Sequence, residues 1–127
     1  MKTIVLAIKP RHASNIYRGI KPIEFRKSIP NCMHPENGGQ SVIALLYESA
    51  PISKITGECV LGIHSFSPEG VFDNEILKKG CITETEMLAY FAGKKGWALS
   101  VSDVVKYGKP IPLGNIKAPQ NFRYWNP

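Results

Sequence analysis

Gly-Ile-Lys-Pro-Ile-Glu-Phe-Arg, residues 19–26, brings a helix-ending residue, strand formers and charges together within eight positions. Gly19 can adopt the positive φ that closes a helix. The alternation after it puts Ile23 and Phe25 on one face of a strand. Glu24 and Arg26 share the opposite face with Cα atoms about 6.5 to 7 Å apart, so they can form an ion pair or hold one ligand jointly.

Lys21 lies just upstream, where the predicted helix gives way to the predicted strand. Two interpretations of this charged group are open. Either Lys21, Glu24 and Arg26 face a cleft together, or they are solvated charges on a surface strand. The rest of the chain has to distinguish them.

Length and composition indicate one globular domain, residues 1–127. With 127 residues and 43% hydrophobic content, the chain can bury about two thirds of its unfolded surface without disulfides or a structural metal. The formal charge of +6 and the pI near 9.3 favour a polyanionic partner. Many basic proteins bind no nucleic acid, so charge alone does not establish one.

The cysteines and the apolar runs predict a cellular setting. Cys32, Cys59 and Cys81 are an odd number and match neither a zinc pattern nor a disulfide framework. A reducing, cytoplasmic location is the simplest inference. The longest apolar runs are far shorter than the roughly 20 residues that span a bilayer, and the N-terminus shows no signal-peptide pattern. We therefore expect no membrane association.

Periodicity predicts the elements of the N-terminal half. Residues 3–8 form a strand covered on both faces, residues 11–18 a helix with one apolar stripe, and residues 22–29 a strand. Residues 31–40 are rich in turn formers and predict a mobile loop. Within that loop Cys32, His34 and Glu36 form one compact group with no second half elsewhere, so we predict no metal site.

The C-terminal half alternates strands and short helices. Thr83 and Glu86 have the spacing of a capping box, and the helix that follows is predicted to bury Met87, Leu88, Tyr90 and Phe91. The tail interleaves aromatic residues with a cation, so it either packs onto a barrel or contacts nucleic acid. The remaining predicted segments are strands at residues 42–47, 57–66 and 97–107 and a helix at residues 72–79.

The element order predicts an α+β fold. One strand and helix are followed by several strands, two helices and further strands, with short connections. Such strands can curl into a small β-barrel with helices at its rim. The chain has no Ser-His-Asp order, phosphate loop or Gly-x-Gly-x-x-Gly fingerprint, and we predict no cofactor.

One block of this sequence resembles a known family. The pattern I-K-P-x-x-A-x-x-I-x-x-G-x-K-x-x-E-x-R-K of the ASCH domains, a branch of the PUA-like superfamily, is matched in register by residues 8–27. Weaker similarity continues to residue 124. The matching residues are Ile8, Lys9, Pro10, Ala13, Ile16, Gly19, Lys21, Glu24, Arg26 and Lys27, then Tyr47-Glu48-Ser49-Ala50-Pro51, Gly57-Glu58, Tyr90-Phe91-Ala92-Gly93 and Pro119-Gln120-Asn121-Phe122-Arg123-Tyr124.

The resemblance implies a PUA-like mixed β-barrel with flanking short helices and a basic cleft that binds RNA or a nucleotide. In this interpretation a charged Lys21 clamps a phosphate or carbonyl, Arg26 offers a forked donor, and Glu24 orients the pair or accepts from a base edge. The expected ligand-binding residues are Lys9, Lys21, Glu24, Arg26, Tyr47 and Ser49, the last two on the opposite wall.

Two alternatives remain open. Some ASCH relatives are hydrolases, which implies a ribonuclease or a nucleoside amidohydrolase that uses Lys21 with Glu24 or Glu58 as catalytic residues. Amidohydrolase relatives carry a hydroxyl residue at the position of Glu24 and a downstream glutamate in the region where this chain has Lys79 and Gly80. The other alternative is a protein-interaction or transcription-associated module that docks through its aromatic tail.

Overall fold

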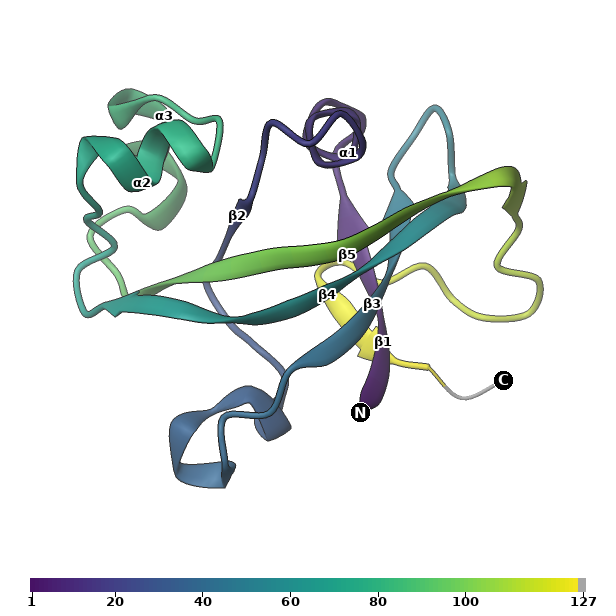
Figure 1. Ribbon diagram of the computed structural model, residues 1–127, viewed down its shortest axis with the longest axis horizontal. Helices are drawn as coiled ribbons and strands as arrows, with labels where there is room; N and C mark the ends of the chain where they lie inside the picture. The colour runs from purple at the N-terminus through teal and green to yellow at the C-terminus, as the bar shows by residue number, and fades with distance from the viewer. Residues whose placement is uncertain (126–127) are drawn as a thin grey trace.

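The computed structural model describes residues 1–125 and confirms the predicted α+β fold. A curled six-stranded sheet is flanked by three short α-helices (Figure 1). The elements are β1 (Lys2–Ile8), α1 (Pro10–Tyr17), β2 (Ile23–Arg26), the 3-10 helices η1 (Asn31–Met33) and η2 (Pro35–Asn37), β3 (Val42–Glu48), β4 (Lys54–Ser67), α2 (Asn74–Lys79), α3 (Glu84–Phe91), β5 (Gly96–Ile111) and β6 (Phe122–Tyr124).

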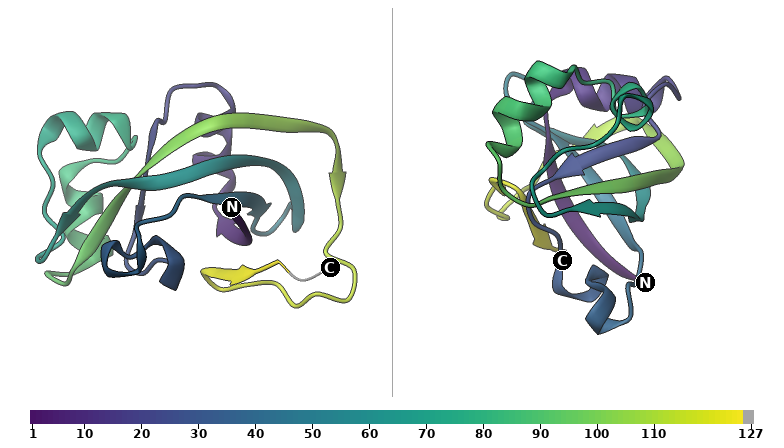
Figure 2. Two further views of the ribbon diagram at one scale, coloured as in Figure 1. Left: turned by 60° about the horizontal axis from the view of Figure 1, so that its bottom comes forward. Right: turned by 90° about the vertical axis from the view of Figure 1, so that its left-hand side faces the viewer.

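The sheet has the strand order β2-β5-β4-β3-β1-β6. β1 and β3 are parallel and the other neighbouring pairs are antiparallel. The long strands β4 and β5 bend around the molecule, so the sheet forms a half-barrel (Figure 2). Its two edge strands are β2 and β6, and we call the gap between β2 and the β1–β6 pair the seam.

Two core clusters position the helices. The larger lies between α1 and the sheet and includes Ile16, Leu46 and Leu99. The other attaches α2 and α3 to the sheet through Phe25 of β2, whose ring lies 5.2 Å from that of Phe72 and 6.1 Å from that of Phe91. Both helices therefore sit beside β2, at the left of Figure 1.

The predicted capping box of α3 is confirmed, whereas its predicted buried face is partly wrong. The Thr83 hydroxyl accepts from the Glu86 N–H, and the Glu86 carboxylate accepts from the Thr83 N–H. Met87 and Phe91, four residues apart, are buried. Leu88 and Tyr90 are 51% and 39% exposed, because the short helix packs only one narrow stripe against the sheet.

Other differences concern element boundaries. The predicted strand at residues 22–29 pairs only as Ile23–Arg26. β4 and β5 are longer than predicted and carry register shifts that let them bend. The loop predicted to be mobile forms η1 and η2, and Met33 anchors it in the core.

The aromatic tail packs onto the sheet, which was one of the two arrangements predicted for it. β6 pairs antiparallel with β1, and the Trp125 N–H donates to the Thr3 carbonyl at 2.9 Å. Phe122 packs against the larger core cluster. Within residues 1–125, the helices are all too short or too polar to cross a membrane.

Candidate functional site

A cleft of about 860 Å³ opens along the seam, between α1 on one side and α3 on the other. Its floor is formed by residues of β2, and its ends by residues that follow β1 and precede β6. The lining residues are Ala7, Ile8, Lys9, Arg11, His12, Lys21, Glu24, Phe25, Arg26, Lys27, Ser28, Ser49, Ile82, Glu86, Ala89, Tyr90, Gln120 and Asn121.

Lys21 is placed in the floor by the end of α1. Gly19 has the predicted positive φ of +76°, which turns the chain after α1, and Lys21 lies in the turn that leads into β2. The Lys21 side chain is only 1% exposed. Its Nζ donates to the Gly80 carbonyl and lies 3.3 Å from Oε1 of Glu24, so the lysine ties β2 to the end of α2.

Arg26 and Glu24 form the predicted ion pair. Nε and Nη2 of Arg26 both donate to Oε2 of Glu24, at 3.0 and 2.7 Å. Nη2 also donates to the Ala7 carbonyl at 2.7 Å, and Nη1 to Oδ1 of Asn121 at 3.0 Å. The guanidinium therefore spans the seam. The alternative of a solvated surface strand is wrong, because Glu24 and Arg26 are both buried.

Glu24 remains a carboxylate despite its burial. Burial raises the pKa of Glu24, but the adjacent Arg26 and Lys21 charges together outweigh it and hold that pKa below its ordinary value. Oε2 accepts from Arg26, and Oε1 lies 3.3 Å from Nζ of Lys21 in an ion pair. The Glu24 carboxylate is thus paired with cations of the protein itself, which leaves few acceptor positions for hydrogen bonds from a ligand.

Acid is expected to destabilise the fold through this residue. Because the folded-state pKa of Glu24 is depressed, its contribution to stability is complete above the unfolded pKa of about 4.3 and is lost as pH falls through the lower folded-state pKa. Urea unfolding midpoints measured between about pH 7 and pH 3 should fall. The Glu24→Gln variant should lack this part of the decline; an identical decline in the variant would exclude Glu24 as its source.

Charge is strongly concentrated in the cleft. Five of its lining residues are cationic and two are carboxylates, a net charge of +3 on a chain whose formal charge is +6. Glu24 is paired with Lys21 and Arg26, and Glu86 with Arg11 at 2.7 Å. The cleft therefore has an excess of positive charge, which favours negatively charged groups over positive ones.

His12, in the first turn of α1, adds a donor to the cleft. Nη2 of Arg11 lies 3.3 Å from Nε2 of His12; arginine can only donate, so the ring proton belongs on Nδ1. That Nδ1 is buried and has no hydrogen-bond partner among residues 1–125. Burial and, next, the Lys21 charge lower the pKa of His12, which keeps the ring neutral at pH 7.

Apart from Glu86, the α3 wall of the cleft is apolar and aromatic. Ile82, Ala89 and Tyr90 line it, and Nζ of Lys27 lies 4.7 Å from the centre of the Tyr90 ring. An exposed aromatic ring beside a cation is a surface on which a nucleic-acid base can stack. The cleft thus has one apolar wall and one wall rich in donors.

The structure brings most of the predicted ligand-binding residues together. Lys9 and Ser49 line the cleft with the three charged residues of the motif. Tyr47 does not, since strand alternation turns its side chain to the face where it packs with Val5 and Ile55. Glu58 also lies outside the cleft lining and accepts from the Tyr107 hydroxyl at 2.7 Å.

Several cleft residues escaped prediction from the sequence. His12 follows Lys9-Pro10 at the start of α1, a position near the motif that could have indicated it. Tyr90 belongs to a block that resembles the family, but the sequence predicted it to be buried. Ser28 gave no signal. Within residues 1–125, no three His, Cys, Asp or Glu side chains gather as a metal site.

Comparison with solved structures identifies the fold. ASCH from Zymomonas mobilis superposes with a TM-score of 0.75 at 23% sequence identity, over 98% of this chain and 88% of the other. The chain has the fold of an ASCH domain. A tyrosine-to-phenylalanine variant of the Zymomonas mobilis ASCH matches with a TM-score of 0.73 at 22% identity, over 99% and 91% of the two chains. A serine-to-alanine variant gives 0.72 at 22%, over 98% and 89%.

The resemblance to ASCH domains is thus confirmed at the level of the fold. Sequence comparison adds nothing to it: no family model matches this chain, and no curated protein matches it. In this ASCH fold the motif residues lie at the seam of the half-barrel.

Proposed function

We propose that this protein binds single-stranded RNA or a nucleotide in the seam cleft. The observation that carries the proposal is the excess of positive charge in the cleft beside an exposed tyrosine ring. Phosphates are bound by lysine and arginine, and bases stack on aromatic rings. A cleft of about 860 Å³ is within the range of small-molecule and cofactor sites.

The geometry favours binding over hydrolysis. A hydrolase at this site needs a free base, and both oxygens of Glu24 are already engaged, Oε2 by hydrogen bonds from Arg26 and Oε1 by an ion pair with Lys21. Lys21 is itself held by Glu24 and by the Gly80 carbonyl. The docking alternative is less favoured too, because Phe122 and Trp125 of the tail pack against the protein's own sheet.

Binding to a fluorescent RNA oligonucleotide of eight to ten nucleotides, followed by anisotropy, tests the proposal. Lys9→Gln and Lys27→Gln remove exposed cations from the cleft and should each weaken binding about two- to fivefold. Each should also reduce the slope of log affinity against log salt by about 0.7, the value for one phosphate contact on a single strand.

Lys95→Gln is the matched control, since Lys95 is exposed and lies outside the cleft. It makes the same charge change, so it should leave both affinity and salt slope nearly unchanged. Equal losses in all three variants would mean that RNA responds only to overall charge. If the RNA oligonucleotide does not bind the unmodified protein, the proposal is refuted.

Glu86→Gln is expected to strengthen RNA binding about two- to fivefold. The substitution removes one negative charge from the cleft and releases Arg11, whose Nη2 now lies 2.7 Å from the Glu86 carboxylate. Glutamine keeps the capping box of α3, so the unfolding temperature should change little. Unchanged or weaker RNA binding by a folded Glu86→Gln variant would show that Arg11 does not meet the ligand.

A further inference from the structure

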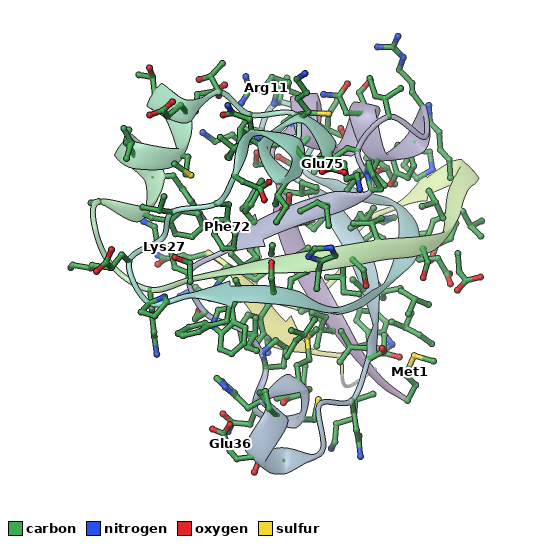
Figure 3. The ribbon with its side chains drawn as sticks, turned by 60° about the vertical axis from the view of Figure 1, so that its left-hand side comes forward. Met1, Arg11, Lys27, Glu36, Phe72 and Glu75 are labelled. Atoms are coloured by element: carbon green, nitrogen blue, oxygen red, sulfur yellow. The ribbon has the colours of Figure 1, made fainter. Side chains whose placement is uncertain are left out.

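Two cations approach α3 one helical turn apart. Arg11 reaches the helix at Glu86, and Lys27 reaches it at Tyr90. These two α3 residues are four positions apart, so they lie on one face and about 6 Å apart along the axis. In Figure 3 Arg11 lies near the helices at the top and Lys27 lies lower, beside the sheet.

The two cations belong to opposite rims of the cleft. We call Lys9 and Arg11, which follow β1, the first rim, and Lys27 and Ser28, which follow β2, the second rim. β1 and β2 lie on opposite sides of the seam. Lys9 and Lys27 are exposed and lie in no ion pair within residues 1–125, so each rim has a cation free for an anion.

Between the two rims, the α3 wall carries no charged side chain apart from Glu86. The floor of the cleft is rich in hydrogen-bond donors. Ala89 and Ile82 of the wall are apolar and contribute no side-chain hydrogen-bonding group. On the floor, Arg26 uses four of its five N–H groups on protein acceptors, and Nδ1 of His12 is unpartnered within residues 1–125. A flat ring with acceptor atoms on its edge complements such a space.

A ligand that fits this cleft carries a negative charge at each rim and a flat ring between them. A nucleotide inside a strand, with one phosphate on each side of its base, has this arrangement. A free nucleoside monophosphate would use one rim only. Successive phosphates of an extended single strand can each meet a different cation, and the exposed Lys9 and Lys27 lie on opposite rims.

We infer that the cleft takes an internal nucleotide of an RNA strand, with its base against Tyr90 and the phosphates on its 5′ and 3′ sides at the two rims. This inference rests on the proposed function and names its ligand. Lys9 holds one flanking phosphate and Lys27 the other. The base edge presents acceptor atoms to Arg26 and His12.

Competition against the fluorescent RNA oligonucleotide tests the inference. The competitors are the 3′,5′-bisphosphates, the 5′-monophosphates and the 3′-monophosphates of the four common nucleosides. For at least one base, the bisphosphate should compete about tenfold better than either monophosphate, since it alone makes a charge-assisted contact at each rim.

The rim variants distinguish the two phosphate positions. Lys9→Gln should weaken the bisphosphate and one monophosphate while leaving the other monophosphate unchanged, and Lys27→Gln should do the reverse. Lys95→Gln should alter none of them.

Three results would overturn the inference. The first is a monophosphate that competes as well as the bisphosphate of the same nucleoside. The second is a pair of rim variants that both weaken the same monophosphate. The third is a set of bisphosphates that all fail to displace bound RNA. In each of these cases the RNA still binds, so the proposed function stands while the inference falls. Absence of RNA binding itself is the separate result that refutes the proposed function.

Discussion

Replacing Glu24 by glutamine is expected to lower the free energy of unfolding by about 3 to 5 kcal/mol, the usual cost of breaking a buried ion pair from one side. The substitution leaves Lys21 and Arg26 buried with no carboxylate between them. The new amide group would also direct N–H donors at groups that only donate. Urea unfolding at pH 7, monitored by tryptophan fluorescence, measures the loss.

Glu75→Gln is the control for this prediction. It makes the same change in an ion pair with Lys79 whose side chains are 79% and 50% exposed, where a loss of at most about 0.5 kcal/mol is expected. A Glu24→Gln loss as small as that of Glu75→Gln would show that the buried cluster contributes little to stability. In that case the charges of the cluster would matter for the proposed ligand rather than for the fold.

Replacing Phe91 by alanine is expected to cost about 3 to 5 kcal/mol, the usual range for a buried phenylalanine. Its ring is 1% exposed and lies 6.1 Å from that of Phe25 and 5.8 Å from that of Phe72. These contacts attach α3 to the sheet. Since α3 is one wall of the cleft, RNA binding should weaken together with stability.

Leu88→Ala is the matched control on the same helix, because Leu88 is exposed. It should change stability by less than about 0.5 kcal/mol and leave RNA binding as it was. Unaffected RNA binding in a folded Phe91→Ala variant would mean that the α3 wall is dispensable for the ligand.

Local rules were enough to predict the pair at the centre of the site. Glu24 and Arg26 share a face because strand side chains alternate, and the positive φ of Gly19 places them after a helix. The capping box of α3 follows from Thr83 and Glu86 in the same way. These features depend on residues within a few positions of one another, so they can be deduced without a tertiary structure.

The cleft itself depends on contacts between distant residues. Lys21 meets the carbonyl of Gly80, 59 positions away, and Arg26 meets Asn121, 95 positions away. Tyr90 faces the cleft because Phe91 takes the core position beside it. Neither composition nor periodicity specifies these approaches, and a residue such as His12 gains its role only from them.

The charged seam also bears on how copies of this protein behave in a crowded solution. β2 is a four-residue edge strand with unpaired backbone groups on its outer side, and such edges can recruit strands from other molecules and seed aggregates. Charges that point inward from an edge strand oppose that association, since a new strand would have to bury them. The Lys21, Glu24 and Arg26 cluster therefore opposes strand addition at the same place where the ligand is proposed to enter.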